Sequence, residues 1–436
     1  SPVLAQLMRW PWGRKHMAEP GPANPWLSII GMGADGPDSL SAKARQKLDE
    51  AEILVSSTRL FAMIAQDDRP RITWQSPFAD TLHAIAAQRP RKIAVIATGD
   101  PLCYGVGNWL LTRFSLDEMV IIPGVSAFAL ACARMGWPQH KVVLHTLHGR
   151  DDKSIRSVFA PQQKIIVLSE DATTPKTVCA HLVELGYERS KVSVLTHLNG
   201  ERENRFDVIA SDGADFFDSE FEANEDFNLN TLAIDCVAGS GAKVVSSAPG
   251  LPDELFSQFR KMTKRELRAL AISRLAPLPG DIMWDVGAGS ASVAVEFLRL
   301  APGGAAYTFD IDAEAQAHQR ENANRFALSG LHAGYQTEMP LQLGDSDCPR
   351  PNAIFMGGGI SRDKIDAALR FLLPGGRFVC HAVTIESEAD LFAAQRKHGG
   401  SLSRISVARL QSLGSVHGFK PAMTITQWAW QKEDEA

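Results

Sequence analysis

The chain alternates short apolar segments with longer amphipathic segments, and it does so in two separate stretches. The first stretch runs from Trp26 to about Cys236 and holds the clearest strand candidates. They are WLSII (26–30), EILVS (52–56), KIAVIA (92–97), MVIIP (119–123), KVVLH (141–145), KIIVLS (164–169) and KVSVL (191–195). Short apolar strands that alternate with helix-length segments predict an α/β fold for this part of the chain.

The same rhythm begins again in the second stretch. A helical segment at 263–275 precedes strand candidates, with amphipathic helices between them, at 281–286, 305–311, 353–358 and 376–383. This order predicts an α/β doubly wound sheet of the Rossmann-like type. The last segments, 403–414 and 421–430, alternate apolar and polar residues and are expected to form an edge hairpin.

A break in composition separates the two stretches. Residues 237–252 are rich in Ala, Gly, Ser and Pro and carry little charge, which is typical of a linker. A chain of 436 residues is too long for one ordinary core. We therefore expect one domain at 26–236 and a second at 253–436.

Two smaller features complete the domain prediction. The stretch MGWPQHK at 135–141 is expected to be a hinge between subdomains at about 26–137 and 138–236. Residues 1–25 contain no chemistry that can be identified and lack the apolar core and cleavage site of a signal peptide. They are expected to be an N-terminal extension, with Met17 as a candidate natural start.

The charge balance limits the classes of partner. The formal net charge is −5, and 22% of residues are charged. This gives no general attraction to nucleic acid or to an anionic membrane, so neither is expected as a partner. No apolar run approaches the length of a membrane span. A polyanionic small molecule would need locally placed Arg and Lys.

Cysteine usage indicates a reducing compartment. The six cysteines are scattered, with no C-x-x-C pair: Cys103, Cys132, Cys179, Cys236, Cys348 and Cys380. We interpret them as thiols rather than as a disulfide or metal framework, and no metal is expected. A cytoplasmic location follows from this interpretation.

The first candidate site lies in the second domain, at the end of a predicted strand. It is the run Asp285-Val-Gly287-Ala288-Gly289-Ser290-Ala291, followed about one strand later by Asp310. Glycines allow close approach of a ligand, and a carboxylate at the next strand end can accept hydrogen bonds from ribose hydroxyls. A plain tight turn and NAD are the alternatives, but the spacing differs from the dinucleotide G-x-G-x-x-G pattern. S-adenosylmethionine (SAM) fits better.

Several motifs of this half resemble those of the precorrin decarboxylating methyltransferase family of the cobalamin pathway. They are MTKRELRA, DVGAG, the acid at Asp310, NANRF, LGD and FMGGG, and the likeness runs from about Gly250 to the C-terminus. The resemblance implies a SAM pocket lined by Thr263, Gly287, Gly289, Asp310 and the Asp345-Ser346 turn. The sequence departs from the family pattern at two places. Ala291 stands where the family usually has a third glycine, and the stretch between Asp345 and the next strand is short.

A basic cluster opens the helix at the start of this half. It contains Lys264, Arg265 and Arg268, together with Glu266. Positive charge in a first helical turn opposes the helix dipole, which a nearby anionic ligand would offset. Contact with substrate carboxylates is one hypothesis for the three basic residues, and a solvated, salt-bridged helix face is the other.

The first domain carries three glycine-containing strand ends. They are Gly31-Met-Gly33, the run Gly99-Asp100-Pro-Leu-Cys103-Tyr-Gly, and Pro123-Gly-Val-Ser126-Ala127. Gly99 allows close approach, Asp100 offers acceptors, and Ser126 can cap the next helix. Each motif taken alone is also ordinary α/β turn chemistry.

In this order, and followed by LHGR at Leu147–Arg150, the motifs resemble the tetrapyrrole methylase superfamily. The likeness spans about residues 26–236. It implies two α/β subdomains with SAM between them, and SAM contacts at Gly99, Asp100, Cys103, Ser126, Ala127 and Leu168. It also implies substrate contacts at Gly31 and Gly33, while His148 and Arg150 are candidate carboxylate contacts on a loop. A lone histidine is also consistent with a packed or solvated residue.

The two halves together resemble the family of fused precorrin-6Y C5,15-methyltransferases (decarboxylating). That resemblance implies an enzyme with two SAM sites that methylates C5 in the first domain. It implies C15 methylation and decarboxylation of the C12 acetate in the second, giving precorrin-8. It also suggests a homo-oligomer. No catalytic side chain is identified. The alternatives are a nucleic-acid methyltransferase and a SAM-binding scaffold with one degenerate domain.

Overall fold

The computed structural model describes residues 25–221, 225–258, 262–335, 338–340 and 348–433. Contacts divide the chain into an N-terminal unit that ends at Ser240 and a C-terminal unit that begins at Gly241. The segment Asp151–Ala160 groups with the C-terminal unit. The boundary at 240/241 falls inside the predicted linker, while most of the predicted N-terminal extension lies outside the described residues.

Both ends of the predicted linker are fixed to their own units. In the N-terminal unit, the Gly239 N–H donates to the Gly186 carbonyl at 2.8 Å. In the C-terminal unit, Arg299 donates to the carbonyl of Val245 at 3.0 Å, and the Glu296 carboxylate accepts the N–H of Leu251 at 2.9 Å. The part of the linker that belongs to neither unit is therefore shorter than its composition suggests.

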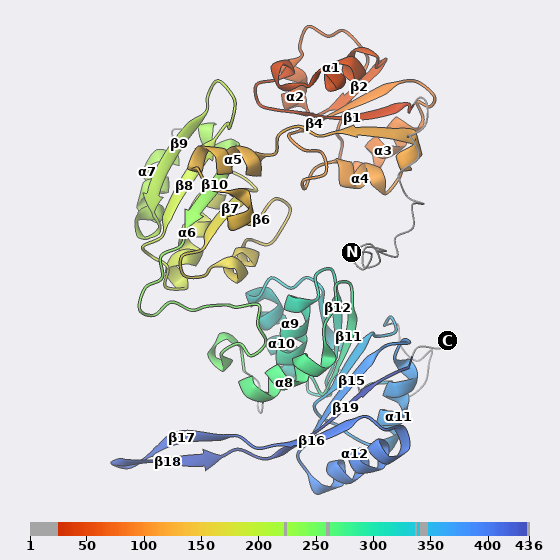
Figure 1. The fold of residues 1–436 in the computed structure, drawn as a ribbon, viewed down its shortest axis with the longest axis vertical. Coiled ribbons are helices and arrows are strands. Elements are labelled where there is room, and N and C mark those ends of the chain that lie inside the picture. The colour runs from red at the N-terminus through yellow and green to blue at the C-terminus, as the bar shows by residue number, and fades with distance from the viewer. Residues whose placement is uncertain (1–24, 222–224, 259–261, 336–337, 341–347, 434–436) are drawn as a thin grey trace, which may run out of the picture. The chain divides into compact units, whose positions relative to one another are not determined.

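A parallel sheet forms the first half of the N-terminal unit (Figure 1). Its strands run in the order β3-β2-β4-β1-β5. They are β1 (Leu27–Met32), β2 (Ile53–Ser56), β3 (Arg71–Thr73), β4 (Ile93–Thr98) and β5 (Met119–Ile122), with helices α1 (Ala42–Asp49), α2 (Thr58–Met63), α3 (Phe78–Ala86) and α4 (Gly107–Leu111). Alternate strand residues pack against α1 and α2 on one face and against α3 and α4 on the other, so near-continuous apolar strands are required.

A mixed sheet forms the second half of this unit, with strand order β6-β7-β10-β8-β9. Its elements are β6 (Val143–Thr146), β7 (Lys164–Leu168), β8 (Lys191–Thr196), β9 (Asn204–Ile209), β10 (Asn230–Asp235), α5 (Ala127–Met135), α6 (Thr174–Glu184) and α7 (Gly213–Phe221). β6 and β7 are parallel, while β10 is antiparallel to both of its neighbours, β7 and β8.

The change from the first sheet to the second comes earlier than the predicted hinge at 135–141. Helix α5 packs on the second sheet, where Phe128 and Cys132 contact Ile166 and Leu195. The crossing therefore lies between Ile122 and α5, and residues 135–141 form the end of α5 and a turn beyond it. The sequence showed the turn but not which sheet the helix would cover.

The C-terminal unit is a seven-stranded sheet in the order β13-β12-β11-β14-β15-β19-β16. Its strands are β11 (Ile282–Val286), β12 (Ala305–Phe309), β13 (Leu331–Tyr335), β14 (Ala353–Met356), β15 (Arg377–Ala382), β16 (Ser401–Ile405) and β19 (Ile425–Gln431). Helices α8 (Arg265–Leu275), α9 (Ser292–Leu300) and α10 (Ala313–Arg325) pack together, and α11 (Arg362–Phe371) and α12 (Ile385–His398) contribute to a separate core. The predicted α/β fold class is confirmed in both units.

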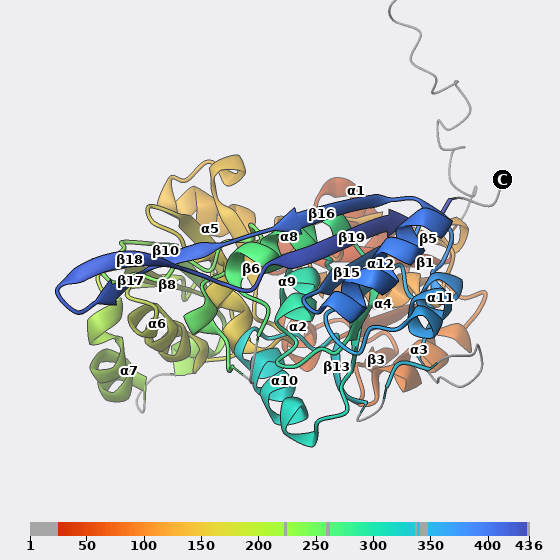
Figure 2. The ribbon, with the colours of Figure 1, turned by 90° about the horizontal axis from the view of Figure 1, so that it is seen from below.

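The C-terminal strands differ in one respect from the predicted edge hairpin. β19 lies inside the sheet, between β15 and β16. A separate two-stranded hairpin, β17 (Ala408–Leu413) and β18 (Val416–Pro421), projects from β16 and β19, as Figures 1 and 2 show. Four of its apolar side chains are exposed: Leu410, Leu413, Val416 and Phe419.

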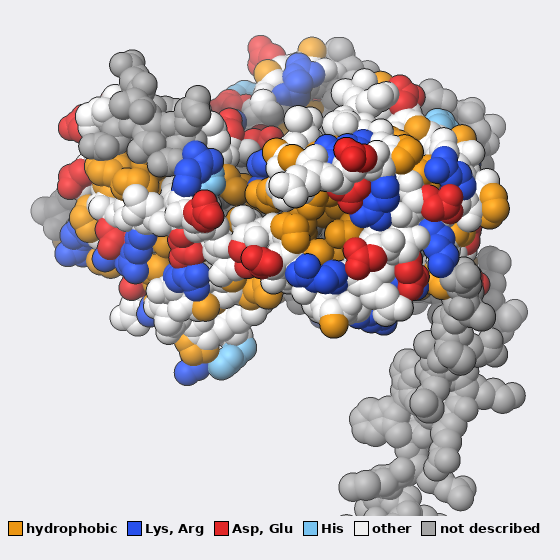
Figure 3. All heavy atoms as spheres, turned by 90° about the horizontal axis from the view of Figure 1, so that it is seen from above, with side chains coloured by type: hydrophobic (Ala, Val, Ile, Leu, Met, Phe, Trp, Pro, Cys, Tyr) orange, Lys and Arg blue, Asp and Glu red, His pale blue; other side chains and the backbone are white. Residues whose placement is uncertain are grey.

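Short 3₁₀ helices complete the elements. They lie at Pro37–Ser39, Leu116–Glu118, Gln139–Lys141, Asp152–Val158, Ala210–Asp212, Glu225–Asn228 and Asp253–Leu255. Within the described residues, no helix has both the length and the apolar character needed to cross a membrane. On the face drawn in Figure 3, basic side chains are interspersed with acidic ones rather than gathered into a broad strip.

Candidate active site

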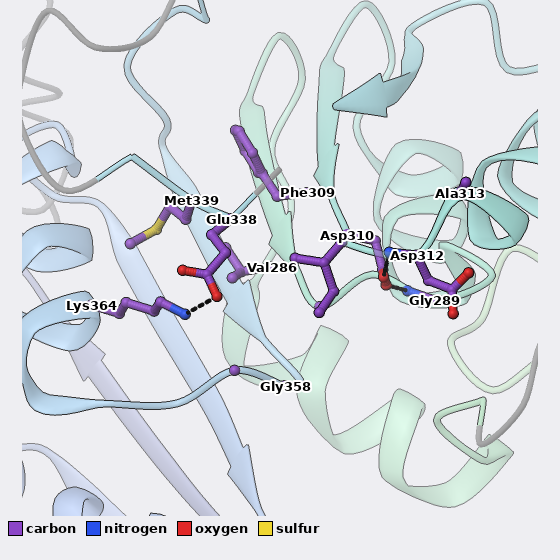
Figure 4. A pocket seen from close by; sticks show the side chains of 13 residues that line it. Val286, Gly289, Phe309, Asp310, Asp312, Ala313, Glu338, Met339, Gly358 and Lys364 are labelled. Carbon is purple, nitrogen blue, oxygen red and sulfur yellow. Dashed lines mark hydrogen bonds and ion pairs between the residues drawn. The ribbon is translucent and has the colours of Figure 1, made fainter. Parts of the chain in front are cut away.

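A pocket of about 530 Å³ opens at the carboxyl ends of three central strands of the C-terminal unit (Figure 4). Val286 from β11, Phe309 from β12 and Gly358 beyond β14 contribute to its wall. β11 lies between β12 and β14, where the direction of the strand order reverses. Ligands of open α/β sheets bind at this topological switch point.

The glycine turn after β11 forms one wall of this pocket. Gly287 and Gly289 both have positive φ, at 67° and 53°. A Cβ on Gly287 would come within 2.8 Å of the Gly358 backbone, so glycine is required for the two loops to approach each other. A Cβ on Gly289 would meet no atom within 4 Å, so glycine is favoured there by the positive φ rather than by close packing.

Asp310 links the glycine turn to the end of β12. Its Oδ2 accepts the Gly289 N–H at 2.7 Å, and its Oδ1 accepts the Asp312 N–H at 3.0 Å, as Figure 4 shows in part. Asp312 in turn caps α10 through its own side chain. Asp310 is therefore fixed in the pocket with lone pairs that remain available to ribose hydroxyls.

Asp285 lies beneath the turn and is almost fully buried. One carboxylate oxygen accepts the Ala294 N–H at 3.2 Å, and the other has no partner among the described residues. Burial, with a smaller contribution from the charge of Asp310, raises the pKa of the Asp285 carboxyl to about 7.

We expect Asp285 to make the stability of the C-terminal unit depend on pH. Because its folded-state pKa is raised, the folded chain binds more protons, and its stabilisation is complete below the ordinary carboxyl pKa of about 4 and is lost as pH rises through about 7. The measurement is the free energy of unfolding of the wild type and of Asp285→Asn between pH 4 and 8. As pH rises, the free energy of unfolding of the wild type should fall relative to that of the variant. A difference between the two that stays constant with pH would contradict a raised pKa at Asp285.

An ion pair closes the side of the pocket away from Asp310. Lys364 of α11 and Glu338 are 3.1 Å apart, and Figure 4 shows them beside Met339. The lysine side chain is only 15% exposed, whereas that of the glutamate is 62% exposed. The sequence prediction missed all three residues, because a single basic residue in a helix after FMGGG carries no signal of its own.

The residues of this pocket fit a sulfonium nucleoside. The volume lies within the range of small-molecule sites. Asp310 supplies acceptors for ribose hydroxyls, and the exposed Ile311 side chain supplies apolar surface for a base. Gly289 leaves open space where a side chain would otherwise project.

Three glycines pack together where the carboxyl ends of β1, β4 and β5 meet, which we call the carboxyl edge of the first sheet. They are Gly31 of β1, Gly99 after β4 and Gly124 after β5. A Cβ on Gly31 would be 1.9 Å from the Gly99 carbonyl oxygen and 2.3 Å from the Gly124 nitrogen. Gly31 is buried, so its glycine is explained by backbone packing rather than by contact with a ligand.

The loop after β4 and the start of α5 lie beside these glycines, and local hydrogen bonds fix both of them. Asp100 accepts the Leu102 N–H at 2.9 Å, and the Cys103 N–H donates to the Asp100 carbonyl at 3.1 Å. Ser126 caps α5 by accepting the Ala129 N–H at 3.2 Å. Gly99 lies against the Val125 backbone, so both loops meet at the carboxyl edge of the first sheet.

Of the remaining candidates of this unit, Leu168 is the half-buried last residue of β7, and three others lie on loops. Gly33 donates to the Ser39 hydroxyl at 2.8 Å. His148 is 3.1 Å from Glu170, and both side chains are at least half exposed. Arg150 is exposed, and its guanidinium lies 5.4 Å from the centre of the Tyr104 ring.

Two family models match the chain, one in each unit. The model described as tetrapyrrole (corrin/porphyrin) methylases matches residues 27–209. The model described as precorrin methyltransferase domain matches residues 254–432. Apart from Asp151–Ala160, each matched range falls within one of the two units, so the two family models match in the order in which the units occur along the chain.

A relative of full length decides the family. The precorrin-6Y C(5,15)-methyltransferase [decarboxylating] of Sinorhizobium sp is 35% identical over 417 residues, which are 95% of this chain and 98% of the relative. The chain belongs to the precorrin-6Y C(5,15)-methyltransferase (decarboxylating) family.

Two shorter relatives each match part of the chain. The cobalt-precorrin-7 C(5)-methyltransferase of Salmonella typhimurium is 31% identical over 160 residues, 37% of this chain and 79% of the relative. The probable cobalt-precorrin-6B C(15)-methyltransferase (decarboxylating) of Saccharolobus solfataricus is 34% identical over 156 residues, 35% of this chain and 78% of the relative. Membership of this methyltransferase family makes the chain an enzyme and implies SAM as the methyl donor.

The structure brings together only part of the predicted SAM set in the C-terminal unit. Gly287, Gly289 and Asp310 line the pocket. Ser290 and Ala291 are buried, so the Ala291 methyl group that departs from the family pattern lies in the interior, at a φ of 58°. Ala288 and Thr263 are half-buried and are absent from the pocket wall, and Asp345 and Ser346 lie outside the described residues.

The prediction that Arg268 binds a substrate carboxylate is wrong. Its side chain is 0% exposed and donates to Glu296 at 2.6 Å and to Asp253 at 3.0 Å. A guanidinium that is fully enclosed and paired with two carboxylates has no route to a ligand. Lys264 lies 3.9 Å from Asp253, and Arg265 is exposed, so these two remain candidates.

Proposed function

We propose that this chain transfers methyl groups from SAM to C5 and C15 of a precorrin and removes the carboxyl group of its C12 acetate, giving precorrin-8. The N-terminal unit would methylate C5, and the C-terminal unit would methylate C15 and decarboxylate. One observation carries the proposal: a single relative whose name includes both transfers and the decarboxylation matches 95% of this chain.

The chemistry asks for orientation more than for a nucleophilic side chain. SAM supplies an electrophilic methyl group, and the meso carbons of the reduced macrocycle are enamine-like nucleophiles. The chain's own residues would hold the reactants in line and exclude water. In the C-terminal unit, Asp310 and the Gly287–Gly289 turn would orient the nucleoside, which leaves the open side of the pocket to the macrocycle.

Decarboxylation needs an electron sink and a poorly solvated carboxylate. The bond between the acetate methylene and its carboxyl carbon would break, and carbon dioxide would leave. The electron pair would pass into the adjacent imine-like ring, and the methylene carbon would take up a proton to become a methyl group. Lys364 is a candidate contact for another carboxylate of the macrocycle, because it lies at the pocket wall in an ion pair with the exposed Glu338.

We propose a second SAM site in the N-terminal unit. It would be formed by Gly99, Asp100, Cys103, Ser126, Ala127 and Leu168. Support comes from the two glycine-containing loops that meet at one sheet edge. Gly33, His148 and Arg150 remain proposed substrate contacts, and Gly31 would act by shaping this edge.

We further propose that the enzyme is a cytoplasmic homo-oligomer without a nucleic-acid partner. The six cysteines are free thiols, which supports a reducing compartment. An isolated two-stranded hairpin is marginally stable in water, and β17–β18 exposes apolar side chains, so a second copy of this chain is the occupant we expect for it. Light scattering measures the oligomeric state.

Replacing Asp310 with alanine should separate the two activities. Loss of its acceptors should weaken binding of S-adenosylhomocysteine to the C-terminal unit by at least about tenfold, since hydrogen bonds to charged groups contribute about 1.5–3 kcal/mol. The full-length variant should lose C15 methylation and carbon dioxide release from precorrin-6B while it still methylates added precorrin-7 at C5. Mass spectrometry and NMR of the products measure this.

The matched control is Glu314→Ala. Glu314 is an exposed acid in the first turn of α10 that does not line the pocket. It should behave as the wild type. Carbon dioxide release that is unchanged in the Asp310 variant would refute the assignment of decarboxylation to this pocket.

A further inference from the structure

Arg59 lies at the edge of the first sheet where the glycine loops meet. It is the second residue of α2, which follows β2, and its Nη2 donates to the Thr98 hydroxyl at 2.8 Å. Thr98 is the last residue of β4 and immediately precedes Gly99. β2 and β4 are parallel neighbours, so the guanidinium lies at the same sheet edge as the Gly99-Asp100 loop.

The guanidinium of Arg59 has no carboxylate partner among the described residues. Other arginines of this unit are paired: Arg69 with Asp67, and Arg134 with Glu203. Within the part of the chain that the structure describes, Arg59 bonds only to the Thr98 hydroxyl, although a guanidinium carries five N–H donors. The Arg59 side chain is exposed, and the protein on one side of it lowers the pKa of the guanidinium through partial burial.

A second arginine lies at the other end of the same loop, and it too has no carboxylate partner in the described ranges. Arg150 lies over the ring of Tyr104, five residues after Gly99. Tyr104 has a φ of 56°, which is strained for a side chain of its size. The nearby His145 adds no charge at neutral pH, because burial and, to a smaller degree, the Arg150 charge lower its pKa to about 4.

Two cations that lack anionic partners thus border a loop at the sheet edge proposed to hold the cofactor. Both side chains are exposed, so their unused N–H donors can bind an anion that enters this edge from solvent. The loop itself offers Asp100, whose Oδ1 accepts the Leu102 N–H rather than an arginine. A ligand carboxylate would supply the anion that the described residues do not place here.

We propose that Arg59 binds a carboxylate of the macrocycle in the N-terminal unit, with Arg150 as a second contact on the far side of the loop. The inference rests on the proposed function, which supplies a tetrapyrrole with several carboxylate side chains. A planar guanidinium can hold a carboxylate through two parallel hydrogen bonds. Arg59 is a substrate-binding residue that orients the macrocycle before methyl transfer, and it takes no part in bond making.

The test compares full-length Arg59→Gln and Arg59→Lys with the wild type, using precorrin-7 and SAM. The KM for precorrin-7 should rise at least about tenfold in Arg59→Gln, since a charge-assisted hydrogen bond is lost, while kcat changes little. Arg59→Lys keeps the charge but not the paired geometry, so its KM should lie between the two. An unchanged KM in Arg59→Gln overturns the proposal.

The matched control is Arg91→Gln. Arg91 precedes β4 at its opposite end and forms an exposed pair with Glu52 at 3.3 Å. Its loss should leave KM within about twofold, because the pair is exposed and lies at the opposite end of β4 from the proposed site. If Arg59→Gln fails to fold, which its thermal melting curve would show, Arg59→Lys carries the test.

A binding measurement decides whether Arg59 contacts a carboxylate of the macrocycle or the amino-acid carboxylate of the cofactor. In an Asp310→Ala background, calorimetry with S-adenosylhomocysteine reports on the N-terminal unit, and 5′-methylthioadenosine lacks the amino-acid carboxylate. Arg59→Gln should leave both affinities unchanged. A loss confined to S-adenosylhomocysteine would assign Arg59 to the cofactor and overturn the proposal. If the wild type fails to methylate precorrin-7, the proposed function itself fails.

Discussion

Gly31→Ala is expected to destabilise the N-terminal unit by about 3 kcal/mol or more and to abolish C5 methylation. The added methyl group would lie 1.9 Å from the Gly99 carbonyl oxygen and 2.3 Å from the Gly124 nitrogen. Both are backbone atoms at strand ends, which cannot rotate away as a side chain can. The sheet edge must open to admit the methyl group, and the two loops proposed to hold SAM move with it.

Chemical denaturation and product analysis measure this effect. Unfolding of the N-terminal unit should begin at lower denaturant concentration, while carbon dioxide release by the C-terminal unit should persist. Gly241→Ala is the control, since a Cβ there meets no atom within 4 Å. A variant at Gly31 with normal stability and a raised KM alone would instead restore the role in substrate binding predicted from the sequence.

The second large effect is expected at Arg268. Its replacement by methionine should destabilise the C-terminal unit by about 3–5 kcal/mol, because it leaves the buried Glu296 without its cation. Glu296 also accepts the N–H groups of Gly250 and Leu251, at 2.6 and 2.9 Å, so the segment that enters the unit should loosen as well. Denaturant unfolding followed by tryptophan fluorescence measures the loss.

Two further variants make the explanation specific. Arg268→Met combined with Glu296→Gln should recover part of the loss, because the buried charge of Glu296 is then removed, while Asp253 keeps Lys264 at 3.9 Å. Arg265→Gln, three residues away and exposed, should change stability by no more than about 0.5 kcal/mol. Equal effects of the Arg265 and Arg268 variants would show that the buried pair contributes little.

The tertiary structure overturned the prediction for Arg268 and added residues to the candidate sites that no local pattern indicates. Arg268 and Lys264 belong to one basic cluster in the sequence, but the partners that enclose Arg268 come from the 3₁₀ helix at Asp253–Leu255 and from α9, 15 and 28 residues away. Lys364 and Glu338 meet at the pocket from separate segments. Arg59 lies at the glycine edge only because β2 and β4 are neighbours.

The sequence by itself determined the two α/β units, their order, and the strand end of Asp285–Gly289 with Asp310 one strand later. These follow from short-range requirements: apolar periodicity, positive φ at Gly287 and Gly289, and an acid at the next strand end. Only the tertiary structure decided that α5 covers the second sheet, that Gly31 packs against backbone, and which arginines are paired. Burial and pairing depend on segments distant in the chain, and strand order sets which of those segments meet.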